Sequence, residues 1–297
     1  MKQMMKQSGK LAKAYRIERG KHFKLKDFDP ADTGGIRSKE RATAAMQKSL
    51  EQLADLQDRL YAQDQWALLL IFQGMDASGK DGVIKHVMTG VNPMGCQAYS
   101  FKAPSSEEQQ HDYHWRTMQR IPERQRIGIF NRSYYEEVLI VRVHPELLQN
   151  EKIPPALINK KIWQERFGDM CAFERYLTRN GIVVRKFFLN LSKKEQAKRF
   201  LARLDEPEKN WKFSAADIHE RKYWDDYMHV YEDMIQNTAT PAAPWYVVPA
   251  DNKWFTRLVV ASAIIDTLEK LNLSFPKVDA SRRKELEKAR KFLEAKH

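Results

Sequence analysis

A short glycine-rich segment contains the residues of this sequence whose types and spacing most clearly suit a chemical task. Residues 74–80 read Gly-Met-Asp-Ala-Ser-Gly-Lys, which has the spacing G-x-x-x-x-G-K, in a chain of 297 residues. In such a loop the glycines let backbone N–H groups point at an anion, and a helix N-terminus and a lysine add positive potential. The apolar run 66–72 precedes the segment and the helical pattern 83–87 follows it. This context predicts a phosphate-binding loop between a strand and a helix.

One position of this loop departs from the usual pattern. Asp81 follows Lys80, where a serine or threonine hydroxyl commonly binds Mg²⁺. Asp76, inside the loop, offers a carboxylate oxygen, which is a hard ligand suited to Mg²⁺. An acid among phosphates would repel them unless a cation lay between the two. We therefore expect Asp76 to hold a magnesium ion.

A second polar segment directly follows the predicted strand 126–130. Asn131 stands where phosphate-loop proteins usually carry an acid that supports the metal, and it offers only a neutral oxygen. Arg132 could bind a phosphate as a bidentate fork, although a structural salt bridge fits the local pattern equally well. Glu137 follows close behind. We expect Asn131 and Glu137 to lie where an acceptor phosphate binds.

Four further basic residues are candidates for contacts with phosphates. Arg199 and Arg203 are four residues apart and share a face of a predicted helix, which could equally be a solvated face. Lys209 and Lys212 flank Trp211 in segment 205–214, which interrupts two helical stretches and could form a lid. Basic residues around an aromatic ring also suit single-stranded nucleic acid.

The hydrophobic pattern predicts the elements that position these residues. Short apolar runs alternate with helical periods, which indicates an α/β fold with a parallel sheet and ligands at the carboxyl ends of its strands. The predicted strands are 66–72, 97–101, 126–130, 182–189 and 245–248. Two helix signals are Ser38 as an N-cap and a capping box at Ser105/Glu108 that opens a helix through Trp115 and Met118. The others are a capping box at Ser192/Glu195, an apolar stripe over 163–177 that stops at Asn180-Gly181, and a helix over 252–271.

Composition and charge restrict the classes of protein. Charged residues make up 30% and hydrophobic residues 42%, which excludes a mostly disordered chain. The two cysteines, the short apolar runs and an N-terminus without an apolar signal segment predict a cytoplasmic protein with no membrane partner. The formal net charge is +12, and residues 1–26 and 277–297 together account for all of it. We expect a basic N-terminal extension over 1–26, a domain over 27–276 and a basic C-terminal helix over 277–297.

The motifs together resemble the polyphosphate kinase 2 family. The resemblance rests on the loop Gly74 to Gly82, on Phe-Asn-Arg-Ser-Tyr-Tyr-Glu-Glu-Val-Leu at 130–139, on Asp-x-Pro-Glu-Lys-Asn-Trp-Lys-Phe at 205–213 and on Asp-Pro-Ala-Asp-Thr-Gly at 29–34. It covers about residues 20–272, and the segment Phe-Asn-Arg-Ser-Tyr-Tyr-Glu at 130–136 looks like that of the class III subgroup.

The resemblance implies a three-layer P-loop kinase fold that is similar to thymidylate kinase, with a five-stranded parallel sheet and a helical lid over about 192–235. It implies reversible phosphoryl transfer from inorganic polyphosphate to nucleoside mono- and diphosphates with Mg²⁺ or Mn²⁺, in a homo-oligomer such as a dimer or tetramer. Six residues are expected to act in catalysis: Asp76, Lys80, Arg132, Glu137, Arg199 and Arg203. Those expected to bind phosphate or nucleotide are Gly74, Ala77, Ser78, Gly79, Lys80, Asp81, Gly82, Lys85, Asn131, Arg132, Lys209 and Lys212, and those expected to bind metal are Asp76 and Asn131.

Two other functions remain open from the sequence. A nucleoside monophosphate kinase that uses ATP as donor would have the same phosphate loop. A non-catalytic protein that binds polyphosphate or RNA would have the same basic residues, but residues 27–276 carry balanced charge, so we expect no nucleic-acid partner. His111 and His114 are three residues apart without a third ligand nearby, which favours a surface position over a zinc site.

Overall fold

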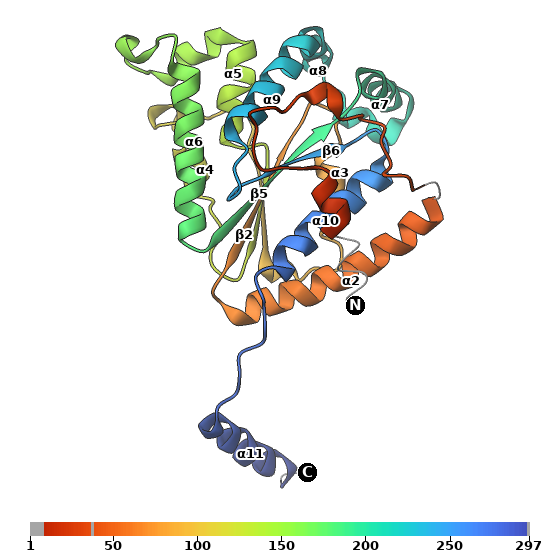
Figure 1. The fold of residues 1–297 in the computed structure, drawn as a ribbon, viewed down its shortest axis with the longest axis vertical. Helices are drawn as coiled ribbons and strands as arrows, with labels where there is room; N and C mark the ends of the chain where they lie inside the picture. Colours follow the sequence, from red (N-terminus) through yellow and green to blue (C-terminus); the bar gives the residue numbers. More distant parts are fainter. Residues whose placement is uncertain (1–8, 37–38, 296–297) are drawn as a thin grey trace.

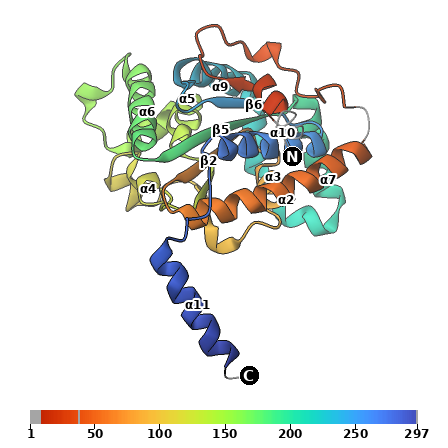
Figure 2. The same cartoon turned by 60° about the horizontal axis from the view of Figure 1, so that its bottom comes forward.

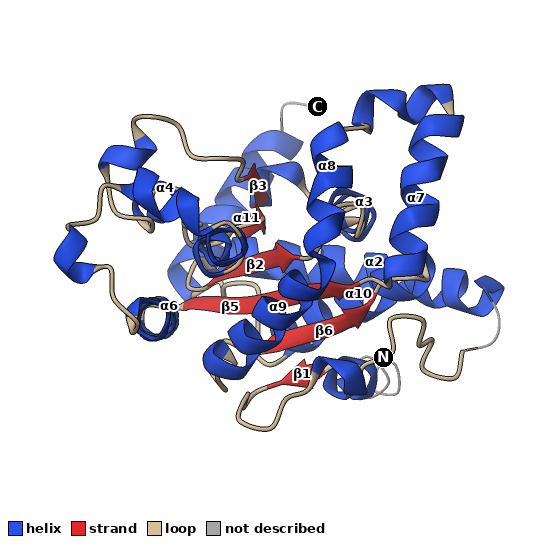
Figure 3. Ribbon diagram, turned by 90° about the horizontal axis from the view of Figure 1, so that it is seen from above, coloured by secondary structure: helices blue, strands red, loops and turns tan. Residues whose placement is uncertain are grey.

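The five predicted strands form one sheet, and a short sixth strand extends it at one edge (Figure 3). The structure, a computed structural model, describes residues 9–36 and 39–295. The strands stand in the order β1-β6-β5-β2-β4-β3. Their bounds are β1 (Arg16–Ile17), β2 (Ala67–Gln73), β3 (Cys96–Ser100), β4 (Ile127–Asn131), β5 (Ile182–Asn190) and β6 (Trp245–Pro249).

The central strand β2 explains why its sequence is an unbroken apolar run. All of its residues are buried, because helices cover both faces of the sheet. It pairs in parallel with β4 on one side and β5 on the other, with Leu70 opposite Ile129 and Arg185. Parallel pairing brings the carboxyl ends of these strands to the same edge, so the loops after β2 and β4 meet there.

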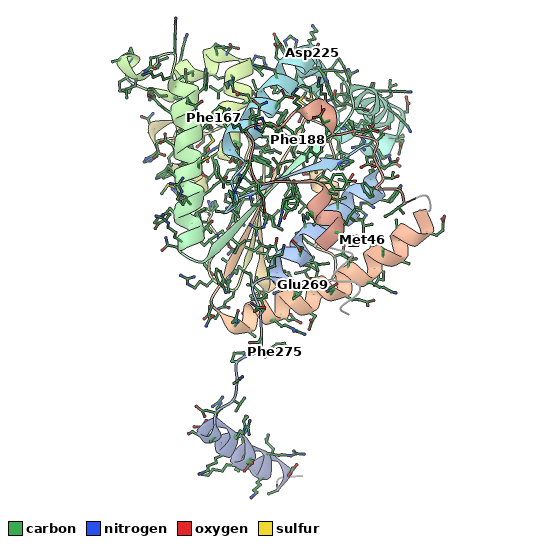
Figure 4. The ribbon with its side chains drawn as sticks, viewed as in Figure 1. Met46, Phe167, Phe188, Asp225, Glu269 and Phe275 are labelled. Carbon is green, nitrogen blue, oxygen red and sulfur yellow. The ribbon has the colours of Figure 1, made fainter. Side chains whose placement is uncertain are left out.

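Helices cover the sheet in two layers, which confirms the predicted three-layer α/β fold (Figure 1). One face carries α2 (Lys39–Gln63), α3 (Lys80–Val87) and α10 (Lys253–Glu269), and the other carries α4 (Trp115–Met118), α5 (Ile140–Val143), α6 (Ile162–Arg179) and α9 (Trp224–Thr238). Side chains of the sheet interlock with both layers: Phe188 of β5 packs in the same cluster as Phe167 of α6 (Figure 4).

The helix signals in the sequence are confirmed at two places and fail in part at a third. Gly181, at φ +80°, follows the end of α6 as predicted, and Ser192 accepts a hydrogen bond from Glu195 N at 3.1 Å at the start of α7 (Lys193–Asp205). The capping box at Ser105 and Glu108 also forms. It opens only the 3-10 turn η3 (Glu108–Gln110), so the prediction of a continuous helix through Trp115 was wrong. Ser38 lies outside the described residues.

The predicted lid region consists of two parts with different environments. After α7 come the 3-10 helix η7 (Pro207–Lys212), α8 (Ala215–Glu220) and η8 (Arg221–Tyr223), all of which lie at the edge where the strands end. By contrast, α9 buries Met234 and Ile235 completely against the sheet. The predicted lid boundary near residue 235 therefore extends into a core helix.

The two ends of the chain differ in how they relate to the sheet. The described part of the basic N-terminal extension expected over 1–26 contributes to the sheet and its core, because β1 pairs antiparallel with β6 and Tyr15 is buried. At the other end, the predicted basic helix is α11 (Ala280–Glu294), which stands away from the sheet with its side chains exposed (Figures 1 and 2). In the part of the chain that the structure describes, no helix is both long enough and apolar enough to span a bilayer.

Candidate active site

A cavity of about 470 Å³ lies at the carboxyl ends of the strands and collects most of the predicted site residues. These lining residues are Asp76, Ala77, Ser78, Gly79, Lys80, Asp81, Gly82, Asn131, Arg132, Arg199, Arg203, Lys209 and Lys212. Gly74, Lys85 and Glu137 are not part of the lining. The strand order explains the convergence, because the loop after β2 lies beside the loop after β4, and α7 contacts the loop after β2.

The loop after β2 has the geometry of a phosphate-binding loop. Gly74 sits at φ +151°, and a Cβ there would lie 2.9 Å from Ser78 Oγ and 3.0 Å from Leu189 O, so only glycine fits without displacement. Lys80 is buried, and its Nζ donates to Gly74 O at 2.7 Å and Met75 O at 3.3 Å. Burial, followed by the charge of Arg132, lowers the pKa of Lys80. The loop thus holds the lysine ammonium with its own carbonyl groups.

Arg132 pairs with the loop carboxylate instead of standing free. Its Nη2 donates to Asp76 Oδ1 at 2.8 Å, so the salt-bridge interpretation of Arg132 is correct for this structure. The backbone of Arg132 is left-handed at φ +65°, which directs the side chain back toward β2's loop. The carboxylate of Glu136, and after it that of Asp76, raises the pKa of Arg132. The guanidinium therefore remains charged at the mouth of the phosphate loop.

The donor atoms next to this pair suit a hard divalent cation. Asn131 Nδ2 donates to Asp81 Oδ1 at 2.5 Å, while Asn131 Oδ1 is buried without a hydrogen-bond partner. That oxygen and the Asp76 carboxylate form an incomplete oxygen ligand set, which phosphate oxygens and water would complete in the way Mg²⁺ prefers. Among the described residues no group of three or more His, Cys, Asp or Glu side chains could hold a metal alone.

The two lid arginines have different surroundings. Arg199 is buried, and its guanidinium donates to the carbonyl oxygens of Ala77 at 2.9 Å and Ala250 at 2.6 Å. The interpretation of Arg199 as part of a solvated face is therefore wrong. Arg203 is partly exposed and pairs with Asp217 of α8 at 2.8 Å. Arg203 makes fewer hydrogen bonds to main-chain atoms than Arg199 does. Among the described residues it donates to one carbonyl oxygen, Lys212 O, at 3.1 Å.

Glu137 does not reach the phosphate loop. It is buried beside Arg166, whose Nη1 donates to Glu137 O at 2.9 Å, and burial, followed by the charge of Glu151, raises the pKa of Glu137 to about 8. Its neighbour Glu136 is the carboxylate that acts electrostatically on Arg132 and Lys80. Both glutamates lie in the 3-10 helix η4 (Tyr134–Val138), in which adjacent side chains point in different directions.

Sequence reasoning missed three basic residues of the cavity: Lys102, Lys253 and Arg257. Lys102 follows the end of β3, and Lys253 and Arg257 are one turn apart in the first turns of α10, after β6. The rule that ligands bind at the carboxyl ends of parallel strands applies to every strand, and it would have indicated both positions if the ends of β3 and β6 had been searched.

The comparison with known sequences decides the family. Residues 36–276 match the profile of the family described as Polyphosphate kinase 2 (PPK2). The chain belongs to the polyphosphate kinase 2 family. Membership confirms the resemblance predicted from the motifs and assigns the phosphate loop to a family of kinases.

Relatives within this family are similar over nearly their whole length. An ADP-polyphosphate phosphotransferase of Rhodopseudomonas palustris is 52% identical over 95% of this chain and 98% of its own length. An AMP/ADP-polyphosphate phosphotransferase of Meiothermus ruber is 41% identical over 92% of this chain and 98% of its own length. The crystal structure of polyphosphate kinase 2 from Arthrobacter aurescens TC1 superimposes with a TM-score of 0.85 at 39% identity, covering 93% of this chain and 95% of that one.

Proposed function

We propose that the protein transfers the terminal phosphoryl group of inorganic polyphosphate to nucleoside mono- and diphosphates, reversibly and with Mg²⁺ or Mn²⁺. One observation carries the choice of donor: the cavity is lined by nine Lys or Arg residues and only two acids, Asp76 and Asp81. A polyphosphate chain carries about one negative charge per phosphate along its length, and a cavity of this charge would attract it. The relatives from Rhodopseudomonas palustris and Meiothermus ruber, by their names, act on polyphosphate.

Different residues of the cavity have different roles in the proposed transfer. A terminal phosphate oxygen of the acceptor forms a new bond to the last phosphorus of the donor, and the bond from that phosphorus to the bridging oxygen breaks, leaving a polyphosphate shortened by one unit. Lys80 and the N–H groups of the loop hold the phosphates near the reacting centre, and Arg203 faces the charge that develops on the transferring group. Lys209, Lys212 and Lys253 line the path of the remaining donor chain.

Asp76 and Asn131 would hold the divalent cation, which when bound supplies positive charge between donor and acceptor phosphates. The Asp76 carboxylate now paired with Arg132 would then be shared between cation and guanidinium. Chelation of divalent ions should abolish turnover, and Mg²⁺ or Mn²⁺ should restore it, whereas monovalent salt should not.

The acceptor site lies on the β4 side of the cavity. Arg132 and Asn131 are the groups there that can contact an acceptor phosphate, and the carboxylate of Glu136 acts electrostatically on Arg132. Because Asn131 is neutral, the site presents less negative charge to a diphosphate than an acid at that position would. We therefore propose that both AMP and ADP are accepted, as the name of the Meiothermus ruber relative states for that protein.

The donor assay tests the proposal against its alternatives. Purified protein is incubated with AMP, or separately with ADP, plus polyphosphate and Mg²⁺ in the absence of ATP, and the nucleotide products are separated. Formation of ADP and ATP supports the proposal. Turnover of AMP only when ATP is the donor would instead identify a nucleoside monophosphate kinase, and salt-dependent binding of polyphosphate or RNA without any turnover would identify a binding protein.

Three further features belong to the same proposal. We place the protein in the cytoplasm, as a dimer or tetramer of identical chains without a nucleic-acid partner. Light scattering coupled to size exclusion measures the assembly, and a monomer at micromolar concentration would contradict that part alone.

A further inference from the structure

Two side chains on one face of α7 bind the main chain of the phosphate loop. Gln196 Nε2 donates to Asp76 O at 2.9 Å. Arg199 Nη1 donates to Ala77 O at 2.9 Å and to Ser78 O at 3.0 Å. Gln196 and Arg199 are 1% and 9% exposed, so these bonds are shielded from water. Three consecutive carbonyl groups of the loop are thus held by residues one helical turn apart.

These carbonyl bonds determine where the N–H groups of the loop point. In a planar trans peptide unit the N–H points opposite to the C=O, so a carbonyl turned toward α7 directs the next N–H away from it. The carbonyls of Asp76 and Ser78 accordingly direct the N–H groups of Ala77 and Gly79. Backbone in which left-handed residues alternate with others forms a concave group of N–H donors that binds anions. Ala77 at φ +62° and Gly79 at φ +98° are the left-handed residues here.

The conformation at Ala77 needs support from outside the loop. A left-handed backbone is unfavourable for an alanine because its Cβ crowds the following carbonyl oxygen. Glycine at the same position would carry no such cost. The bonds from α7 to the carbonyl groups on either side of this residue are therefore in the right place to stabilise it.

The other atoms of Gln196 and Arg199 anchor this support to the rest of the protein. Arg199 Nη2 donates to Ala250 O at 2.6 Å and Asp251 O at 3.2 Å after β6, and Nε donates to Glu195 at 3.0 Å. Gln196 Oε1 accepts a hydrogen bond from Arg221 Nη1 at 2.8 Å, beyond the lid turn. Every nitrogen of the Arg199 guanidinium is therefore engaged by the protein itself.

We infer that Gln196 and Arg199 are positioning residues, which hold the phosphate loop in the conformation that directs its N–H groups at the donor phosphates. In this role Arg199 connects the loop after β2 to the loop after β6 by hydrogen bonds, and it does not contact the transferring group. The inference rests on the proposed function only for the identity of the donor, because any phosphate donor would occupy the same loop.

The test compares substitutions that distinguish a positioning role of Arg199 from a purely electrostatic role. Gln196→Leu removes one bond to a loop carbonyl and the bond from Arg221, at nearly constant volume. Arg199→Met removes the guanidinium, and Arg199→Lys keeps the charge but cannot reach the four carbonyl groups together. Lys198→Met, on the exposed side of the same helix, is the matched control. For each variant kcat and KM are measured with AMP as acceptor and with polyphosphate and ATP as alternative donors, at two salt concentrations, and thermal unfolding is recorded.

A positioning role for Gln196 and Arg199 predicts a specific pattern of kinetic defects. Gln196→Leu should lower kcat about 10-fold and both Arg199 variants about 10²-fold, whichever donor the wild type uses and at both salt concentrations, because misdirected N–H groups stabilise the transition state less. The control should retain wild-type kcat. If the wild type used only ATP, the donor part of the proposed function would fail while this pattern could still be scored.

Two results would overturn the inference. One is an Arg199→Lys variant that retains most of the wild-type kcat while Arg199→Met loses it, since charge alone would then suffice. The other is a folded Gln196→Leu variant with wild-type kcat. If Arg199→Met does not fold, the Gln196→Leu result decides, because that variant loses a single hydrogen bond to the loop.

Discussion

The guanidinium of Arg132 and the carboxylate of Asp76 lie 2.8 Å apart and join the ends of β4 and β2 across the phosphate loop. In the proposed phosphoryl transfer each of these groups would have a second use, Asp76 as a cation ligand and Arg132 as a phosphate contact. The ion pair keeps both in position when the cavity holds no phosphate, and it prevents the carboxylate from repelling the incoming chain. Binding of substrate and cation then exchanges one partner for another without exposing an unpaired charge.

Removal of the Asp76 charge should impair turnover far more than stability. We expect Asp76→Asn to lower kcat at least about 10²-fold, which corresponds to about 2.7 kcal/mol of barrier. The pair with Arg132 is partly exposed, so the melting temperature should change little. Kinetics at saturating Mg²⁺ together with a thermal melt measure both. A variant with near-normal turnover would falsify the metal role.

Arg203 and Lys209 should respond differently to substitution. Arg203→Ala should lower kcat by roughly 10³-fold, within the range of arginines that stabilise a transferring phosphoryl group, with a smaller change in KM. Lys209 is exposed and pairs with Glu206, so Lys209→Ala should mainly raise the KM for polyphosphate, and the defect should fade as salt increases. Steady-state kinetics at two salt concentrations separate the two. A purely salt-sensitive KM defect in Arg203→Ala would place the catalytic contact elsewhere.

Acceptor choice should depend on Glu136 more than on Glu137. The sequence predicts Glu137 near the acceptor phosphate. Neither glutamate lines the cavity, but Glu137 lies beside Arg166, whereas Glu136 acts electrostatically on Arg132, which does line it. Glu136 is the largest source of the raised pKa of Arg132. We expect Glu136→Gln to change the ratio several-fold while polyphosphate KM stays within about twofold. Rates with AMP and ADP for Glu136→Gln and Glu137→Ala provide the comparison, and a larger ratio change in Glu137→Ala would reverse the assignment.

Glu137 should instead control how stability depends on pH. Burial raises its pKa from an ordinary 4.5 to about 8 in the folded state. Below pH 4.5 both states are protonated; as the pH rises toward 8 the unfolded state releases the proton and the folded state retains it, so rising pH favours unfolding. Glu137→Gln removes this titration. The melting temperature of the variant relative to wild type should therefore climb between about pH 4.5 and 8 and level off above, and a constant difference would contradict the shift.

The sequence predicted the sheet well because its signals are local. The central strand β2 is a continuous apolar run because it is buried on both faces, whereas the edge strand β3 is only partly buried and has a weaker pattern. The strand β1 has only two residues and pairs with a strand near the other end of the chain, so no local pattern marks it. The continuous helix after Ser105 failed because a capping box specifies where a helix begins and not how far it continues.

For the site residues, too, local patterns were predictable from the sequence and long-range contacts were not. Asp76, Lys80 and Asn131 were predictable because they lie in segments with a recognised spacing next to a strand end. The environment of Arg199 was not, since its partners are carbonyl groups of two distant loops, and carbonyl groups have no sequence signature. The choice between Glu136 and Glu137 depends on the direction of adjacent side chains in a 3-10 turn, which their identities do not encode.

The antiparallel pair of β1 and β6 bears on how the chain folds as it is synthesised. Arg16 and Ile17 leave the ribosome well before their partners Tyr246 and Trp245. When β6 docks onto β5, its outer edge can thus be covered at once by a segment that has already been made, and it does not remain open to another chain. Deletion of the first 20 residues would leave that edge uncovered, and the cost would appear as aggregation of newly made protein.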